Sequence, residues 1–286
     1  MNQEHVEAGI IALIKKAETE LPDDVTLALK YAYSLEDGLA KLQLETILKN
    51  IAHAKKTGRP MCQDTGIQTF FVTVGTESPY RTTIEEIITS AVRKATIDIP
   101  LRPNTVDPFT DRNSEDNTGE HVPSITWKLS PGKDLRVTAF PKGGGSENMS
   151  RLVMLNPSVG IPGVKQFVVQ EIIRAGGGPC PPTTVGVGIG GGADVAMMLA
   201  KTALLRPIGE RHKEKKVATI EQELIEEING SGIGPMGLGG KTTVLDVHIE
   251  KAHRHPASLP VGLVIQCWAN RRSTMVIHRD GTWEMH

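Results

Sequence analysis

The three cysteines are the residues of this chain best suited to chemistry. Cys62 stands where a helix pattern gives way to a strand pattern, Cys180 lies in the glycine- and proline-rich run 176–182, and Cys267 ends an apolar run. Three thiolates can hold an iron–sulfur cluster and leave one iron without a protein ligand, and such an iron is a Lewis acid. The count of three therefore favours catalysis over electron transfer, which usually employs four ligands.

The spacing of these cysteines leaves another interpretation open. They stand 118 and 87 residues apart, which matches no short-range zinc or ferredoxin pattern. A free cysteine is most often a small buried apolar side chain. An odd number of cysteines and no secretory signal favour a reducing compartment over disulfides. A non-catalytic subunit with three buried, slow-reacting thiols is the corresponding alternative.

Composition narrows the class of partner. The 286 residues include 32 basic and 33 acidic side chains, so no polybasic field points to nucleic acid or to an anionic membrane surface. No apolar run approaches the ~20 residues that a membrane helix requires. The first residues lack the basic and apolar segments of a secretory signal. We expect a cytoplasmic protein with no nucleic-acid or membrane partner.

The elements that must position the cysteines follow from periodicity and from glycine and proline breaks. Helices are predicted over about 5–57, 83–97, 164–172, 192–205 and 214–228, and strands over about 67–74, 125–129, 135–140, 183–189, 243–249, 260–267 and 273–278. The turn residues 130–134 predict that the second and third strands form a hairpin. Without regular strand–helix alternation, we expect an α+β (mixed α/β) fold: a helical N-terminal region plus small mixed or antiparallel sheets flanked by helices.

Two loops carry residues suited to binding an anion. In the run 142–146, three successive glycines let the backbone approach a ligand, and their N–H groups can form an anion-binding nest. Arg102 stands between Pro100 and Pro103 in a restricted backbone, as suits a bidentate contact with a carboxylate. An ordinary surface arginine is the alternative for Arg102.

Two further patterns point elsewhere. The run Gly186–Gly191 satisfies the G-x-G-x-x-G fingerprint of dinucleotide binding. However, Pro182 shortens the strand before it, and Arg206 stands where an acidic residue is expected. A nucleotide-binding enzyme is kept as a distant alternative. No nearby acid or cysteine completes a zinc site around His255, although a single histidine lining a site as an acid or base stays open.

Four motifs together resemble one family. The runs 61–66, 142–146 and 175–182, and His255-Pro256-Ala257-Ser258 followed by Cys267, are similar to class I fumarate hydratases, which are oxygen-sensitive 4Fe-4S hydro-lyases of the tricarboxylic acid cycle. The resemblance runs over nearly the whole chain. Single-chain members carry a second, C-terminal domain, so this chain resembles the α-subunit of the two-subunit form. L-tartrate dehydratase α-subunits share this architecture.

The resemblance implies an organisation and a set of residue roles. Residues 1–286 would form a single iron–sulfur hydro-lyase domain, and a second, swivelling domain would stand on a separate β-subunit in an α2β2 assembly. The metal ligands would be Cys62, Cys180 and Cys267, the substrate-binding residues Gln63, Arg102 and the backbone of Gly145, and the catalytic residues Asp64 and His255. The catalytic base and further carboxylate-binding residues would come from the β-subunit.

The resemblance also implies an activity. We expect reversible dehydration of (S)-malate to fumarate on a 4Fe-4S cluster with one open iron, and activity only with the β-subunit. Glu147 and Asn148 after the glycine loop look more like the fumarase version than the tartrate version. L-tartrate, another small dicarboxylate, is the alternative substrate.

Overall fold

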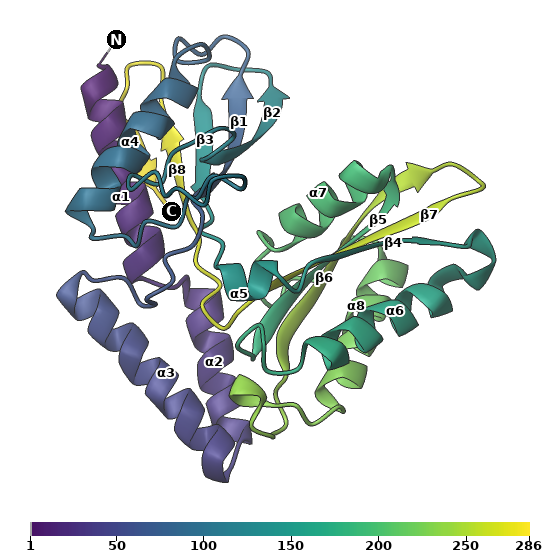
Figure 1. The fold of residues 1–286 in the computed structure, drawn as a ribbon. Coiled ribbons are helices and arrows are strands. Elements are labelled where there is room, and N and C mark those ends of the chain that lie inside the picture. The colour runs from purple at the N-terminus through teal and green to yellow at the C-terminus, as the bar shows by residue number, and fades with distance from the viewer. Residues whose placement is uncertain (1) are drawn as a thin grey trace. The chain divides into compact units, whose positions relative to one another are not determined.

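The computed structural model describes residues 2–286 and has the α+β fold that the sequence predicts. The chain forms two compact units (Figure 1). The first unit contains the residues up to Pro22, Asn50–Gly144 and Arg271–His286, and the second contains Asp23–Lys49 and Gly145–Asn270. Each unit has its own sheet and its own apolar core.

The first unit is a sheet covered by two helices. Its strand order is β2-β1-β3-β8-β9, made of β1 (Thr69–Gly75), β2 (Ser124–Ser130), β3 (Leu135–Ala139), β8 (Ser273–Ile277) and β9 (Trp283–Met285). Helices α1 (Gln3–Thr19) and α4 (Ile84–Asp98) pack on it. Alternation along β1 turns Phe70, Val72 and Val74 into the same core as Ile10 and Ile88.

The predicted hairpin of the second and third strands is wrong. β1 lies between them, paired parallel with β2 and antiparallel with β3. β1 is buried along most of its length, whereas β2 is exposed from Trp127 to Leu129. The more apolar strand therefore takes the central place, and residues 130–134 cross over it instead of forming a tight turn.

The second unit is a sheet with helices on both faces. Its strand order is β4-β7-β5-β6, made of β4 (Arg151–Leu155), β5 (Thr183–Gly191), β6 (Val244–Arg254) and β7 (Leu259–Gln266). Helices α6 (Gly160–Ala175) and α8 (Lys215–Asn229) share a core with the valines of β5, and α7 (Ala193–Ala203) packs against the glycines of β5 (Figure 1).

The remaining helical elements are α2 (Asp23–Leu35), α3 (Gly38–Thr57), α5 (Gly144–Glu147), η1 (Pro157–Val159) and η2 (Pro235–Gly237).

The glycine fingerprint of the second unit has a packing explanation. Gly186 and Gly188 lie within β5, where a Cβ atom would stand 2.0 Å from the carbonyl oxygens of Ala200 and Ala196 in α7. Any side chain at either position would collide with the helix backbone. These glycines let α7 approach the sheet closely, so their presence requires no nucleotide.

Between Asn2 and His286, no helix combines the length and the apolar character needed to cross a membrane.

Candidate functional site

Strand pairing in the second unit brings two of the three cysteines together. Cys180 lies just before β5 and Cys267 just after β7. These strands are antiparallel with Thr184 opposite Gln266, so the start of one meets the end of the other. The Trp268 amide donates to the Cys180 carbonyl oxygen at 3.1 Å. Residues 87 positions apart in the sequence thus become neighbours at one end of the sheet.

The loop around Cys180 is a tight, glycine-built turn. Cys180 itself has a positive φ of 55°, and its amide donates to the Gly177 carbonyl oxygen at 3.0 Å. A Cβ atom on Gly177 would stand 3.0 Å from the Met236 carbonyl oxygen, so the loop backbone packs closely on a neighbouring turn. A Cβ atom on Gly145 would lie 3.5 Å from the Gly178 carbonyl oxygen, so the predicted substrate-binding Gly145 lies beside this loop.

The loop of Cys62 is anchored within the first unit. The Met61 amide donates to the Glu18 carbonyl oxygen at 3.0 Å, and Asn50 Nδ2 donates to the Met61 carbonyl oxygen at 2.7 Å. Met61 is buried, while Cys62 is partly exposed. The anchors therefore hold the neighbour of the thiol and leave the thiol itself accessible.

A buried charge pair lies behind this loop. The Glu18 carboxylate accepts from Arg271 Nη1 at 2.6 Å and from Gln68 Nε2 at 3.0 Å, and all three residues are buried. Burial raises the pKa of the Glu18 carboxyl, although Arg271 and Gln68 both favour its charged form. Gln68 Nε2 also donates to the Thr65 carbonyl oxygen at 3.4 Å, and the Glu18 carbonyl oxygen accepts from the Met61 amide. The buried pair is therefore connected to the Cys62 loop on both sides of the cysteine.

Asp64 holds the glycine loop. Its Oδ2 accepts from the Gly144 amide at 2.8 Å, and its Oδ1 accepts from the Gly66 amide at 2.9 Å and from Asn104 Nδ2 at 3.2 Å. A Cβ atom on Gly143 would stand 3.2 Å from Oδ2, so a residue larger than glycine would crowd this contact. The carboxylate that the sequence predicts as catalytic is therefore also a structural anchor.

Arg102 is fixed through its backbone. Thr65 Oγ1 accepts from the Arg102 amide at 3.0 Å, and Asn117 Nδ2 donates to the Arg102 carbonyl oxygen at 3.1 Å. Thr65 and Asn117 are buried, whereas the side chains of Arg102 and Gln63 are exposed. The guanidinium and the amide thus stand on a rigid backbone with their polar groups free to meet an anion.

His255 lies at the opposite end of the second sheet from Cys180 and Cys267. It stands in the turn between β6 and β7, exposed, and its Nδ1 accepts from the Ala257 amide at 3.1 Å. The length of β7 separates this turn from Cys267, roughly 26 Å for eight residues of extended chain. The second unit therefore does not bring His255 to the two cysteines, and its catalytic role stays a prediction.

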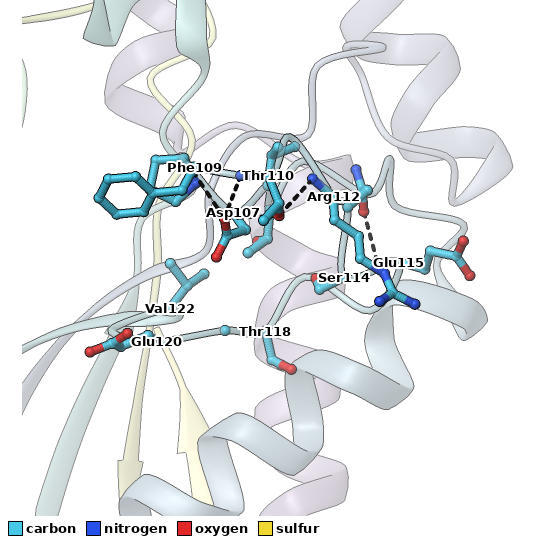
Figure 2. A pocket seen from close by; sticks show the side chains of 14 residues that line it. Asp107, Phe109, Thr110, Arg112, Ser114, Glu115, Thr118, Glu120 and Val122 are labelled. Atoms are coloured by element: carbon cyan, nitrogen blue, oxygen red, sulfur yellow. Dashed lines mark hydrogen bonds between the residues drawn. The ribbon is translucent and has the colours of Figure 1, made fainter.

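A separate hollow of about 580 Å³ lies in the first unit between Thr105 and Val122 (Figure 2). Asp107 closes one turn of its wall, where its Oδ1 accepts from the amides of Phe109 and Thr110 at 2.9 and 2.8 Å. These hydrogen bonds lower the pKa of the Asp107 carboxyl. None of the predicted site residues lines this hollow.

The donor chemistry of the three cysteines suits a cluster of iron and sulfide. All three are partly exposed in loops instead of packed in a core. Cys62 belongs to the first unit and the other two to the second. Over residues 2–286 no three side chains of His, Cys, Asp or Glu gather closely enough to hold a metal ion.

Comparison with known proteins identifies the family. The model of the fumarate hydratase (Fumerase) family matches residues 8–276. The chain belongs to this family. The match covers both compact units, and with it the predicted resemblance is confirmed.

Relatives within the family are named for tartrate. A Methanocaldococcus jannaschii protein, provisionally named L(+)-tartrate dehydratase subunit alpha, is 50% identical over 277 residues, covering 95% of this chain and 97% of its own. The L(+)-tartrate dehydratase subunit alpha of Escherichia coli O157:H7 is 42% identical over 268 residues, covering 93% and 88%. The chain is thus a member of a hydro-lyase family.

Several residues that hold the site carry no recognisable signal in the sequence. Glu18, Thr65, Asn104 and Asn117 are single polar residues that act on loops up to 50 positions away. Arg271 stands four residues after Cys267, which is the one hint that sequence could offer. The roles of all five depend on tertiary contacts.

Proposed function

We propose that this chain is the α-subunit of an iron–sulfur hydro-lyase that dehydrates L-tartrate and acts together with a separate β-subunit. The observation that carries the substrate is the 50% identity to a relative named for tartrate over 95% of the chain. The α in the relatives' names supports a partner chain, and we propose an α2β2 assembly. The cluster-binding part would be residues 1–286, with the second domain on the β-subunit.

Cys62, Cys180 and Cys267 are proposed as the ligands of a 4Fe-4S cluster. Their partial exposure and their loop positions support this assignment, as does the neighbourhood of Cys180 and Cys267 at one end of the second sheet. When bound, such a cluster supplies an iron without a protein ligand, a Lewis acid for the substrate's hydroxyl group.

The chain's own residues would bind and orient the dicarboxylate. Arg102 offers a bidentate contact to one carboxylate, and Gln63 offers an amide donor next to the Cys62 ligand. The exposed Gly145, which has no side chain to obstruct a ligand, would donate its amide N–H. Fixing both carboxylates lowers the entropic cost of reaching the transition state, because the C–O and C–H bonds that break are then held in place.

Asp64 would serve the reacting centre from a fixed position. Its two oxygens already accept three hydrogen bonds, which hold it beside the glycine loop. A carboxylate held in this way can accept a hydrogen bond from the hydroxyl group that departs as water. His255 is the second proposed acid or base, and the base that removes the carbon-bound proton is expected on the β-subunit.

(S)-Malate is the second candidate substrate. The family description names fumarate hydratase, and malate differs from tartrate only by one hydroxyl group. A pocket seldom rejects an additional hydroxyl group strongly, although a site built to hydrogen-bond that group rejects the substrate that lacks it. The preferred substrate is therefore determined by comparing kcat/KM, which reports the reaction rate as well as binding.

The test is a comparison of turnover after anaerobic reconstitution with iron and sulfide, with a candidate β-chain co-expressed. We expect kcat/KM for L-tartrate to exceed that for (S)-malate, and neither activity without the β-chain. A preference for malate would favour the second candidate. No dehydration of either compound by a reconstituted two-chain protein would contradict the proposal.

A matched pair of variants connects the activity to the site. Arg102→Lys keeps the charge but loses the bidentate geometry, so we expect KM to rise at least about tenfold. Arg112→Lys makes the same change on the same exposed loop, beside the hollow that holds no predicted site residue, and should leave KM unchanged. Equal effects of the two changes would exclude Arg102 from the substrate site.

A further inference from the structure

Asn117 lies in the long connection between α4 and β2 and has an unusual backbone conformation. Its φ is 59°, in the left-handed region that residues other than glycine rarely adopt, although asparagine does so more readily than most. The residue is buried, with an exposed fraction of 1%. A buried asparagine in a conformation that favours glycine indicates that its side-chain amide makes contacts that glycine could not make.

The side-chain amide of Asn117 connects three groups. Its Oδ1 accepts from the Asn104 amide at 2.7 Å, and its Nδ2 donates to the Arg102 carbonyl oxygen and to Thr96 Oγ1, each at 3.1 Å. Thr96 is a buried residue of α4, and its hydroxyl donates to a carbonyl oxygen one turn earlier in that helix at 2.8 Å. Asn117 therefore fixes the backbone from Arg102 to Asn104 to a helix of the first unit.

The chemistry of this segment explains why the residue is an asparagine. Pro103 has no N–H group, so the backbone around it offers the Arg102 carbonyl oxygen and the Asn104 amide. A side-chain amide carries one acceptor and one donor group on a single plane and can pair with both. Aspartate would keep the acceptor but lose the donor. Asn117 thus binds this segment as a neighbouring strand would.

The same segment contacts the residues proposed for the reaction. Arg102 is proposed to bind a substrate carboxylate. Asn104 Nδ2 donates to Asp64 Oδ1 at 3.2 Å and to the Gly66 carbonyl oxygen at 3.1 Å. Asp64 in turn accepts from the Gly144 amide of the glycine loop at 2.8 Å. One buried amide group is therefore connected by short paths to the arginine and to the carboxylate.

We propose that Asn117 is a positioning residue that couples Arg102 to Asp64, so that the substrate's carboxylate and its departing hydroxyl group are held at a fixed separation. The inference deepens the proposed function and rests on it, because Arg102 and Asp64 have the roles given there. A displacement of about 1 Å at a reacting group can lower the rate about a hundredfold. A residue that touches neither reacting group can therefore have a large effect on turnover.

The first test needs neither iron nor substrate. Amide hydrogen exchange is measured in the full chain for the natural sequence and for Asn117→Gly, which removes the side-chain amide but tolerates the backbone conformation. We expect exchange at the Arg102 and Gly144 amides to accelerate at least about tenfold, although Thr65 and Asp64, which accept from them, are unchanged.

Two controls accompany this measurement. The Met61 amide, which donates to the Glu18 carbonyl oxygen, should exchange as before in Asn117→Gly, because its contact belongs to another network. Asp111→Gly is the matched variant. Asp111 stands in the same connection with a φ of 55°, and its side chain is exposed. This variant should leave exchange at the Arg102 and Gly144 amides unchanged.

The second test separates the two paths by kinetics in the reconstituted two-chain enzyme. Asn104→Ala breaks only the path to Asp64, so kcat should fall while KM stays the same. Asn117→Gly loosens both paths, so kcat should fall and KM should rise, each at least about tenfold. In the double variant kcat should be no lower than in Asn104→Ala, because both changes break the same path.

Three results would overturn the proposal. They are unchanged exchange at the Gly144 amide in Asn117→Gly, an equal acceleration at the Met61 amide, which would mean a general loss of stability, and additive losses of kcat in the double variant. A natural two-chain enzyme that dehydrates neither tartrate nor malate would contradict the proposed function instead. The exchange measurements would then still decide whether Asn117 couples the two residues.

Discussion

The two units hold their candidate residues by different means. In the first unit, polar side chains from distant positions hold the loops of Cys62 and Arg102, with Asn50, Thr65 and Asn117 donating or accepting hydrogen bonds. In the second unit, main-chain pairing of β5 with β7 aligns Cys180 and Cys267, and glycines make room for α7.

This difference teaches where each unit is vulnerable. A loop held by buried polar groups depends on every partner, because an unsatisfied buried group costs about 1–3 kcal/mol and a buried charge more. Strand ends held by main-chain bonds depend little on individual polar side chains. They depend instead on steric fit along the strand. Loss of polar partners should therefore damage the first unit, and added volume should damage the second.

The largest effect is expected from Glu18→Gln. The change removes the carboxylate that accepts from the buried Arg271 guanidinium, and breaking a buried ion pair costs about 3–5 kcal/mol. Urea unfolding measures the loss. The control is Glu7→Gln on the same helix, where the partner Lys94 is largely exposed and a loss below about 1 kcal/mol is expected. Equal losses in the two variants would refute the role given to the buried pair.

Gly188→Ala tests the steric side of the comparison. The new Cβ atom would stand 2.0 Å from the Ala196 carbonyl oxygen, so α7 must move away from the sheet. Overpacking of this kind costs about 1–3 kcal/mol. Gly145→Ala is the matched change in the same unit, since its nearest neighbour would be 3.5 Å away, an ordinary contact. A stability at Gly188→Ala equal to that of the natural chain would show that α7 packs less closely than described.

Asn104→Ala sharpens the comparison through activity instead of stability. It removes one of the three hydrogen bonds to Asp64, and we expect kcat/KM to fall about tenfold, the equivalent of about 1.4 kcal/mol. The control Asn113→Ala removes a hydrogen bond to the Pro103 carbonyl oxygen in the same loop. That variant should keep full activity. Equal kinetics for both variants would mean that Asn104 does not position Asp64.

The smallest expected effect is a loss of stability at acid pH that depends on the Asp246 carboxyl. Burial opposes the charge of Asp246, but the hydrogen bonds and charges of His248 and Arg211 and the Gly209 amide outweigh it and lower the pKa of this carboxyl. A carboxyl whose folded pKa lies below its unfolded value stabilises the fold above the unfolded value, about 3.9. That stability is lost as the pH falls through the folded pKa.

The Asp246 prediction is measured by comparing the natural chain with Asp246→Asn in urea. The stability advantage of the natural chain should be constant near neutral pH and shrink below about pH 4. An advantage that persists unchanged into strong acid would show that the charge of Asp246 does not contribute.

The sequence predicted elements better than their arrangement. Apolar periodicity located α4, α6, β5 and β7 closely, because that signal is local. The region 5–57, predicted to be helical, consists in the structure of α1, α2 and α3, with breaks before Asp23 and at Glu36-Asp37 that periodicity did not locate. The β2–β3 hairpin was wrong, because which strands pair is decided by burial across the whole sheet and not by the turn between them.

For the candidate site, too, the sequence indicated some residues and missed others. The motifs single out Asp64, Arg102 and the cysteines as candidates, because Cys180 and Arg102 stand in unusual glycine- or proline-rich segments, Cys62 and Asp64 lie between a helix pattern and a strand pattern, and Cys267 ends an apolar run. The residues that hold them could not be found, because a buried polar partner such as Asn117 looks like any other asparagine until the chain is folded. The glycine fingerprint in β5 shows the converse case, a motif whose residues serve packing.

The most direct test of the central claim is the iron content of the full chain after anaerobic reconstitution, measured for the natural sequence and for Cys62→Ser, Cys180→Ser and Cys267→Ser. With three thiolate ligands and one open iron, we expect about four irons per natural chain, a clear loss of iron in each variant and no turnover by any of them. Full iron content in any one variant, or no iron uptake by the natural chain, would contradict the claim that these three cysteines hold a cluster.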